Sequence, residues 1–490
     1  MNAFQHLRIF AALLLALNLF MPNPVLGHSG KPKFHVVIDT DGAIDDMRAL
    51  TILLASDDVR VLAITCSGGT LPAQEVSRKV RALLGTFHHE GVPVGISGEP
   101  AIDLPPWAGF AKAVSWGTEE SMRNVPAPVP SDRLLQQVLA TYSEKVSFLA
   151  LGSLATYARL FSTSPELKDK VERILWYNEH QIEEGFNYRC DPAAFKVIQG
   201  TKLPLVVLDA GDRDYAFNQS FIDRLVAHPS SYAEHILRVH KQDQVASKVG
   251  DGHLKLWDDL LPVYLNAPVL FDLKKEKGMD LVSLNPALPT GFLQETIAQI
   301  LASSNATNNR VFSSFPLDTA LYKPAYAGIL AEVSGKYGLQ EWKAICMTNE
   351  IHGHTGIYSI IGAKAGIRAM EYFNVGINNL EILSFAGNRP PFSCFNDGLQ
   401  ISTGSTIGQG LISVSDSISR RPSLIFSFNG RKARLELSAE IAQRMKADIA
   451  YGVRTYGLKT DAYWLYVEEL AQHYWVDMDR FEIFSLEALN

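Results

Sequence analysis

The chain has 490 residues, a hydrophobic content of 47% and a formal net charge of -7. This length predicts two domains rather than one, and the apolar content excludes a disordered protein. The mild negative charge lacks the basic footprint of nucleic-acid-binding proteins, so we expect no nucleic-acid partner. The four cysteines, Cys66, Cys190, Cys346 and Cys394, are too few for a disulfide scaffold, although one bridge remains open in an oxidising compartment.

The first residues are typical of an export signal. Arg8 precedes a short apolar stretch over residues 9–20, two prolines follow, and the small residue Gly27 suits cleavage. We therefore predict a signal peptide over residues 1–27. The mature protein is then expected to be periplasmic or secreted, with no membrane contact after cleavage. The alternative is an uncleaved membrane anchor.

Strands and helices alternate in the next part of the chain. Short apolar or β-branched runs predict strands at residues 34–38, 59–65, 93–96, 146–151, 174–177 and 203–208, and the segments between several of them have helical character. This alternation predicts an α/β domain with a mostly parallel sheet flanked by helices. Polar clusters follow Ile38, Thr65 and Leu151. Ligands bind at these carboxyl ends of strands in such sheets.

The pattern changes near residue 338. A His-Gly-His motif is followed by turns rich in glycine and serine, and then by alternating strands at residues 423–429 and 432–437. We therefore place the first domain at residues 33–337 and a smaller α+β domain at residues 340–490.

An aspartate cluster directly follows the first predicted strand and consists of Asp39, Asp41, Asp45 and Asp46. Asp39 and Asp41 lie on one side of an extended strand end, and the other two open the following helix. Converging carboxylates repel unless a cation neutralises them. An all-oxygen set favours calcium, which tolerates irregular geometry better than magnesium. The alternative is a solvated acidic turn that caps the helix. An EF-hand is excluded because the run follows a strand and lacks the glutamate at its twelfth position.

The segment VVIDTDGAIDDMRAL at residues 36–50 strongly resembles the signature of the inosine-uridine type nucleoside hydrolases. Further segments resemble other parts of that family in the right order. They are AITCSGG at 63–69, LALGSLA at 149–155, GFN at 185–187 with DPAA at 191–194, and WD at 257–258 with YLNAPVLF at 264–271. The resemblance covers residues 34–337.

This resemblance implies calcium-dependent hydrolysis of the N-glycosidic bond in a nucleoside or a related N-ribosyl compound. It implies that Asp41, Asp46, Asp258 and the backbone carbonyl of Leu151 hold the ion, with Asp39 supporting the site. Asp41 would also be the general base on a water molecule that the metal orients. The implied sugar-binding residues are Asp45 and Asn187. The bond to the leaving base breaks through an oxocarbenium-like state of the sugar. The carboxylates would stabilise the positive charge that develops on the sugar.

Three positions depart from the family pattern and concern substrate recognition. Thr70 stands where a ribose-contacting asparagine is usual. Gly185 stands where a glutamate that binds the 5′-hydroxyl is usual, and the neighbouring Glu184 is a candidate substitute. Trp257 occupies a position at which some members carry a histidine that protonates the leaving base. These changes favour a modified sugar or a compound other than inosine or uridine. Candidate replacements for the missing acid are His180 and His253.

A second resemblance covers residues 340–490. The motifs IHGHTGI at 351–357, SCFNDGLQ at 393–400 and TGSTIGQG at 403–410 resemble the domain found in the E component of formylmethanofuran dehydrogenase and its relatives. His352, His354 and Cys394 are donors that suit zinc. However, Thr355 and Gly356 replace the usual Cys-Pro of that family. The alternative is a degenerate domain in which the histidines form hydrogen bonds and the cysteine is a small buried residue.

Three functions remain in competition. The leading hypothesis is an enzyme that hydrolyses a small-molecule nucleoside or ribosyl substrate. The first alternative is a non-catalytic calcium-dependent protein that binds a sugar or nucleoside, and the second is a metal or redox protein acting through its C-terminal domain. The first resemblance also implies a homo-oligomer.

Overall fold

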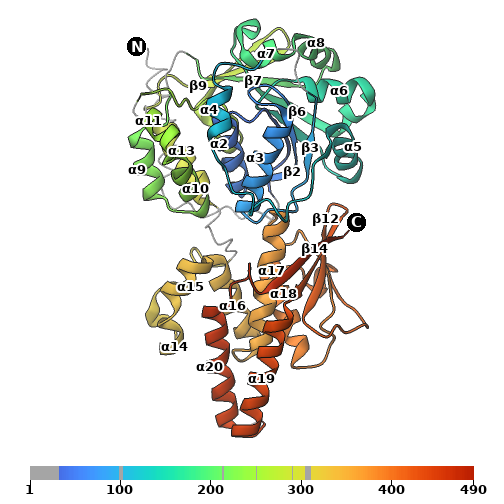
Figure 1. The fold of residues 1–490 in the computed structure, drawn as a ribbon, viewed down its shortest axis with the longest axis vertical. Helices are drawn as coiled ribbons and strands as arrows, with labels where there is room; N and C mark the ends of the chain where they lie inside the picture. The colour runs from blue at the N-terminus through green and yellow to red at the C-terminus, as the bar shows by residue number, and fades with distance from the viewer. Residues whose placement is uncertain are drawn as a thin grey trace. The chain divides into compact units, whose positions relative to one another are not determined.

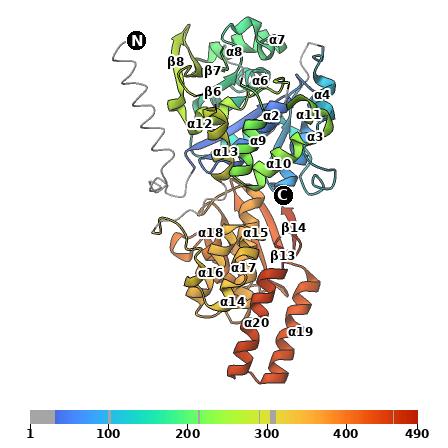
Figure 2. The ribbon, with the colours of Figure 1, turned by 90° about the vertical axis from the view of Figure 1, so that its left-hand side faces the viewer.

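The computed structural model describes residues 32–98, 103–211, 215–249, 251–289, 291–303, 311–458 and 460–489. The predicted signal peptide lies outside the described residues. The chain forms two compact units that divide between residues 304 and 305 (Figure 1, Figure 2). In the described part of the chain, no helix has both the length and the apolar character needed to cross a membrane. All four cysteines are unpaired.

A nine-stranded sheet forms the centre of the first unit (Figure 1). Its strands are β1 (Phe34–Thr40), β2 (Val59–Cys66), β3 (Val94–Ile96), β4 (Val129–Pro130), β5 (Val146–Ala150), β6 (Val171–Tyr177), β7 (Leu205–Asp209), β8 (Phe271–Glu276) and β9 (Met279–Leu284). Their order is β4-β3-β2-β1-β5-β6-β7-β9-β8. Only the edge pair β8 and β9 is antiparallel. The predicted α/β fold with a mostly parallel sheet is therefore confirmed.

Helices cover both faces of this sheet, and the alternation of side chains along β5 shows why. Leu149 belongs to the core that includes α2, α3, α10, α12 and α13. Its neighbour Phe148 points to the opposite face and packs on Tyr157 of α6, with ring centroids 4.5 Å apart. The helices of the unit are α2 (Ile44–Ala55), α3 (Ala73–Thr86), α4 (Ala108–Ala113), α5 (Ser131–Thr141), α6 (Ala155–Thr163), α7 (Phe186–Cys190), α8 (Pro192–Thr201), α9 (Gln219–Ala227), α10 (Ser231–His240), α11 (Asp243–Val249), α12 (Leu260–Asn266) and α13 (Phe292–Ser303).

The strand order reverses at β1. The chain runs outward from β1 through β2, β3 and β4, and then continues with β5 on the other side of β1. Asp39 on β1 lies beside Ala150 on β5 in the parallel register. In doubly wound sheets the crevice beyond the carboxyl ends of two such strands is the usual ligand site. The segments that follow β1 and β5 therefore meet where a ligand is expected.

The second unit contains a five-stranded sheet in the order β11-β10-β12-β13-β14. Its strands are β10 (Glu381–Ser384), β11 (Ile412–Val414), β12 (Ser423–Phe428), β13 (Arg431–Leu437) and β14 (Phe484–Leu489), and its helices are α14 (Pro324–Ala327), α15 (Leu330–Tyr337), α16 (Leu339–His352), α17 (Ile357–Phe373), α18 (Phe395–Thr403), α19 (Ala439–Tyr456) and α20 (Asp461–Asp477). Glycines let α17 and α18 pack closely, because a Cβ at Gly362 would overlap the carbonyl of Phe395. The predicted smaller α+β fold is confirmed.

The division into units falls earlier in the chain than the boundary near residue 338 that the sequence suggested. Helix α15 places Leu330, Val333 and Tyr337 in the core of the second unit, together with Trp342. Its apolar face fits any adjacent core, so its sequence alone does not assign it to one unit.

Candidate active site

The acidic residues of the site come from the turn between β1 and α2. Gly42 has φ of +82°, a left-handed conformation that a side chain disfavours. A Cβ at this position would also lie 3.0 Å from Val76 Cγ2. Glycine therefore lets the chain turn sharply from the strand into the helix. Asp45 and Asp46 then lie in the first turn of α2, where the helix dipole favours negative charge.

The turn holds Asp46 in a fixed orientation. Its Oδ2 accepts hydrogen bonds from Thr40 Oγ1 at 2.7 Å, from the backbone N–H of Asp41 at 2.9 Å and from that of Gly42 at 3.2 Å. All three bonds end on the same oxygen. The side chain is therefore positioned by the turn.

Three carboxylates converge at this point. Asp45, Asp46 and Asp258 are buried and each offers an oxygen within 4.8 Å of the others. No described residue donates a hydrogen bond to the buried Oδ1 of Asp258. A buried oxygen without a donor is costly unless a cation satisfies it. The donor set thus fits a hard divalent ion such as calcium.

Burial and mutual repulsion perturb these groups. Burial, together with the charge of Asp46, raises the pKa of Asp45 to about 7. The pKa values of Asp46 and Asp258 are also raised, again chiefly by burial. Protonation of these carboxyl groups relieves the repulsion between them, but it also makes them weaker metal ligands. A bound cation would do the opposite and hold the groups ionised.

Asp41 lies beside this group but faces the loop after β2. A Cβ at Gly69 would overlap its Oδ2, and one at Gly152 would lie 3.1 Å from its Cβ. Hydrogen bonds from Thr70 lower its pKa, but burial and the charge of Asp46 outweigh them and raise it. Thr70 therefore contacts Asp41. A carboxyl group with a raised pKa in a crevice is suited to proton transfer.

Asp39, near the end of β1, hydrogen-bonds to residues at the end of β2. Its two carboxylate oxygens accept hydrogen bonds from Thr65 Oγ1 at 2.5 Å and Ser67 Oγ at 2.7 Å. Burial raises its pKa to about 6 although these bonds oppose the shift. Asp39 does not belong to the converging group of three carboxylates.

The predicted sugar-binding and carbonyl residues also meet. Asn187 Nδ2 donates to the carbonyl oxygen of Leu151 at 2.8 Å and to that of Tyr177 at 3.0 Å. This contact joins α7 to the ends of β5 and β6. Glu184, in contrast, is exposed on the short helical turn Ile182–Glu184.

The two candidate leaving-group acids, His253 and His180, and the tryptophan at the family's usual acid position take different positions. Trp257 is 45% exposed beside the buried Asp258. His253 is exposed, with its side chain 70% accessible, and lies 3.8 Å from Asp251. His180 Nε2 lies 3.2 Å from the carbonyl oxygen of Val282. Trp257, which is not an acid, is the only one of these three residues that directly adjoins a converging carboxylate in the chain.

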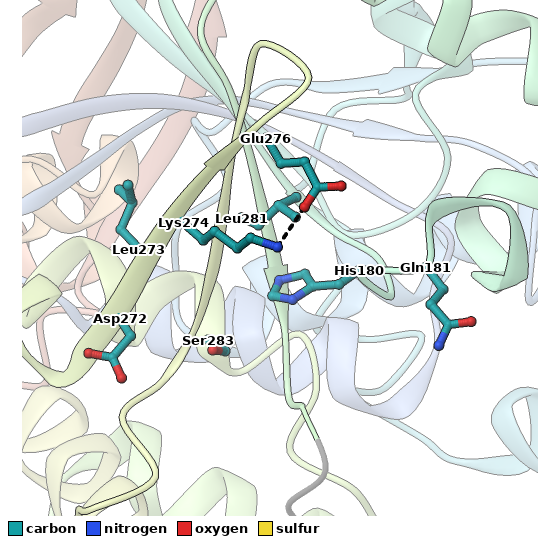
Figure 3. A pocket seen from close by; sticks show the side chains of 8 residues that line it. All are labelled: His180, Gln181, Asp272, Leu273, Lys274, Glu276, Leu281 and Ser283. Carbon is teal, nitrogen blue, oxygen red and sulfur yellow. Dashed lines mark hydrogen bonds and ion pairs between the residues drawn. The ribbon is translucent and has the colours of Figure 1, made fainter.

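A separate cleft of about 300 Å³ lies by the β8–β9 hairpin (Figure 3). His180 lies near Lys274 and Glu276, which both belong to β8 and form an ion pair at 2.7 Å (Figure 3). Its lining residues are His180, Gln181, Asp272, Leu273, Lys274, Glu276, Leu281 and Ser283. None of them belongs to the aspartate group, so this cleft is not the candidate active site.

Two features of the site escaped the sequence interpretation. Trp107 is 44% exposed, donates its indole N–H to Thr70 Oγ1 at 3.3 Å and packs edge-to-face on Phe186. Arg48 forms a buried ion pair with Asp259, at 2.9 Å. Trp107 lies in an irregular segment with no motif. The positions of Arg48 and Asp259, each next to an acidic motif, were the only available signal for the ion pair.

In the second unit the structure brings the two histidines together. His352 Nδ1 lies 2.8 Å from Asp397 Oδ2, and its buried Nε2 has no partner among the described residues. The ring of His354 lies 4.3 Å from that of His352, between centroids. Cys394 packs at the edge of the core, where burial raises the pKa of its thiol. Within the described residues, the only group of three acidic, histidine or cysteine donors within 4.8 Å is the aspartate group.

A family model described as inosine-uridine preferring nucleoside hydrolase matches residues 36–314. This chain belongs to the inosine-uridine preferring nucleoside hydrolase family. Every acidic residue of the candidate site lies within the matched nucleoside hydrolase region. A second model, described as FmdE, molybdenum formylmethanofuran dehydrogenase operon, matches residues 351–478. Both resemblances found in the sequence are therefore confirmed.

The curated relatives of this nucleoside hydrolase family member are distant. The pyrimidine-specific ribonucleoside hydrolase RihA of Klebsiella pneumoniae subsp. pneumoniae is 26% identical over 196 residues, which are 35% of this chain and 58% of that protein. RihA of Salmonella agona is 25% identical over 196 residues, with the same coverage. The chain thus spans 58% of the length of these relatives.

Solved structures of nucleoside hydrolases also match part of this chain. The inosine-uridine preferring nucleoside hydrolase from Bacillus anthracis has 16% identity and a TM-score of 0.43, covering 55% of this chain and 99% of that one. The purine-preferring ribonucleoside hydrolase from Gardnerella vaginalis has 14% identity and a TM-score of 0.41, with coverage of 55% and 99%.

Proposed function

We propose that the first unit hydrolyses the N-glycosidic bond of a nucleoside or a related N-ribosyl compound in a calcium-dependent reaction. The observation that carries the proposal is the convergence of Asp45, Asp46 and Asp258, buried and within 4.8 Å of one another, at the strand-order reversal. Membership of the nucleoside hydrolase family supports the reaction class.

The residues present fit a calcium ion. Asp46 and Asp258 would hold it, joined by Asp41 and the carbonyl oxygen of Leu151, and the nearby Asp45 would hold either the ion or a sugar hydroxyl. When bound, the ion supplies a charge that orients water and sugar hydroxyls and lowers their pKa. The Oδ1 atom of Asp258 accepts no hydrogen bond from the described residues, and this supports the assignment because a cation would satisfy that oxygen.

The chain's own residues supply the remaining chemistry. Asp41 accepts a proton from the attacking water, a role that suits a buried carboxyl group beside the cluster. Asn187 and Asp45 fix the sugar. The carboxylates stabilise the positive charge that develops on the sugar as the bond to the base breaks. Trp107 is proposed to stack on the base through its exposed face, because it contacts Thr70, which in turn contacts Asp41.

A nucleoside panel tests this proposal. The purified full chain is incubated with purine, pyrimidine and modified nucleosides, in calcium and in chelator, and free sugar is measured. We expect release in calcium and loss of release in chelator. Calcium-dependent binding of a nucleoside without release of sugar would instead identify a non-catalytic binding protein.

The second unit is proposed to bind a transition metal through its histidines. The buried Nε2 of His352, which has no partner among the described residues, supports this proposal. Asp397 contacts the other ring nitrogen and so orients the ring, as carboxylates beside metal-binding histidines often do. Metal content by mass spectrometry, compared between wild type and His352→Gln, tests it. The Cys394→Ser variant reports whether the thiol contributes, although the cysteine belongs to no converging group of donors among the described residues.

Export is proposed on the sequence of residues 1–27 alone. Cell fractionation of the full chain, with N-terminal sequencing of the recovered protein, tests both the compartment and the cleavage site. Size-exclusion chromatography with light scattering tests the homo-oligomer that the family resemblance implies.

A further inference from the structure

We propose that Arg48 is a positioning residue for the metal site. Its guanidinium fixes the segment that carries Asp258 against α2, the helix that carries the other two converging carboxylates. The inference rests on the proposed calcium site.

Arg48 joins two segments far apart in the sequence. Its Nε donates to Asp259 Oδ1 at 3.0 Å and its Nη2 donates to Asp259 Oδ2 at 2.9 Å. Both side chains are completely buried, with 0% exposure. Nη2 also donates to the carbonyl oxygen of Lys255. A paired, two-pronged contact of this kind fixes orientation as well as distance.

A third acceptor completes the surroundings of the guanidinium. His240 Nε2 lies 3.5 Å from Arg48 Nη1, and His240 Nδ1 lies 2.8 Å from the carbonyl oxygen of Ile236. Nδ1 therefore carries the proton and Nε2 is free to accept one from Arg48. The imidazole stacks on Phe217, with centroids 3.8 Å apart and planes inclined by 14°. Burial lowers the pKa of His240 to about 3, which keeps the ring neutral and able to accept.

This geometry bears directly on the metal group. Arg48 follows Asp46 by two residues on α2, and Asp259 follows Asp258 at the start of α12. No described residue donates a hydrogen bond to Asp258 Oδ1. The contact between Arg48 and Asp259 anchors the backbone next to Asp258 and so helps to place that carboxylate. Without the anchor, repulsion between ionised carboxylates would move the two segments apart.

The competing interpretation is an ion pair that only stabilises the fold. Buried ion pairs contribute little net stability, because desolvation offsets the attraction, and well-packed apolar residues often replace them without loss. Calcium affinity separates the two interpretations. A merely structural pair would affect the melting temperature of the chelated protein and leave the affinity of the folded protein unchanged.

The test uses the full chain with Ca²⁺ alone as the titrant. Calcium affinity is measured by isothermal titration calorimetry, and the melting temperature is measured in chelator. The variants are Arg48→Lys, which keeps the charge but loses the two-pronged contact, and the double variant Arg48→Met with Asp259→Leu. The matched control is Lys364→Met in the second unit, where Lys364 and Glu341 form an equally buried pair at 2.5 Å.

We expect calcium affinity to fall about 10- to 100-fold in Arg48→Lys and in the double variant. Losses of this size are usual when a residue that orients a metal ligand is replaced. The double variant should melt near the wild type in chelator, and the control should bind calcium normally. Unchanged calcium affinity in Arg48→Lys overturns the inference and leaves the calcium proposal standing. Wild-type protein that binds no calcium overturns both. If the double variant does not fold, Arg48→Lys alone decides.

Discussion

The side-chain amide of Asn187 donates a hydrogen bond of 2.8 Å to the carbonyl oxygen of Leu151. Both atoms belong to the proposed site, and the bond orients the carbonyl at the end of β5. The same amide nitrogen also holds the carbonyl of Tyr177 at the end of β6, at 3.0 Å. One side chain thus ties together the two strand ends on one side of the crevice.

Replacing Asn187 with leucine should weaken both the fold and calcium binding. Two buried carbonyls lose their donor, which costs about 1–3 kcal/mol for each group left unsatisfied. Urea unfolding in chelator measures the first effect and calcium titration the second. Asn266→Leu is the control: Asn266 also donates to a carbonyl, that of Pro262 at 2.8 Å, but at the far end of α12. Equal calcium affinities for the two variants would contradict the placement of Leu151 at the site.

Asp41→Asn should lower turnover by about two to four orders of magnitude, the usual worth of a general base, while substrate binding is retained. Steady-state kinetics and equilibrium binding with the best substrate of the panel measure the two quantities. Asp132→Asn, which removes a surface ion pair with Arg159, should leave both unchanged. Full turnover by Asp41→Asn would mean that another residue is the general base.

Trp107→Ala should raise KM for nucleosides about tenfold or more, since base–aromatic stacking contributes about 1–3 kcal/mol. Trp107→Phe keeps an aromatic face but loses the hydrogen bond to Thr70, so its KM should lie between those of wild type and the alanine variant. Identical KM values for all three proteins would show that the base binds elsewhere.

The sequence predicted those parts of the fold and site that depend on local pattern. The apolar run before Asp39 identified β1, and the glycine turn with its acidic helix start located the site. Relationships between distant segments were not predictable. Asp45 belongs to the converging group while Asp41 faces Gly69, and this distinction depends on side-chain directions set by tertiary packing. The antiparallel pair β8 and β9 lay beyond the alternating pattern.

The Arg48–Asp259 pair shows the same limit. A buried arginine usually signals a partner, but the sequence gives no means of choosing among 52 acidic residues. The pair forms because the fold brings α2 and the start of α12 together, and the sequence does not show this contact.

The pH dependence of the chelated protein follows from the raised pKa values. Burial raises the pKa of Asp39 to about 6 and that of Asp45 to about 7, from an ordinary value of 3.8. Between pH 4 and 7 the folded protein therefore holds protons that the unfolded chain has released. A state that binds more protons is stabilised as pH falls, so the free energy of unfolding in chelator should decrease as pH rises from about 4 to 7.

Calcium should reverse this trend, because the ion binds ionised carboxylates and stabilises only the folded state. Melting curves from pH 4 to 7, with calcium and with chelator, should therefore diverge as pH rises. Asp45→Asn separates this effect from other titrating groups: in chelator, its stability should fall less steeply with pH than that of the wild type. Parallel curves for the two proteins would mean that Asp45 is already ionised in the metal-free site, with some other positive charge compensating its burial.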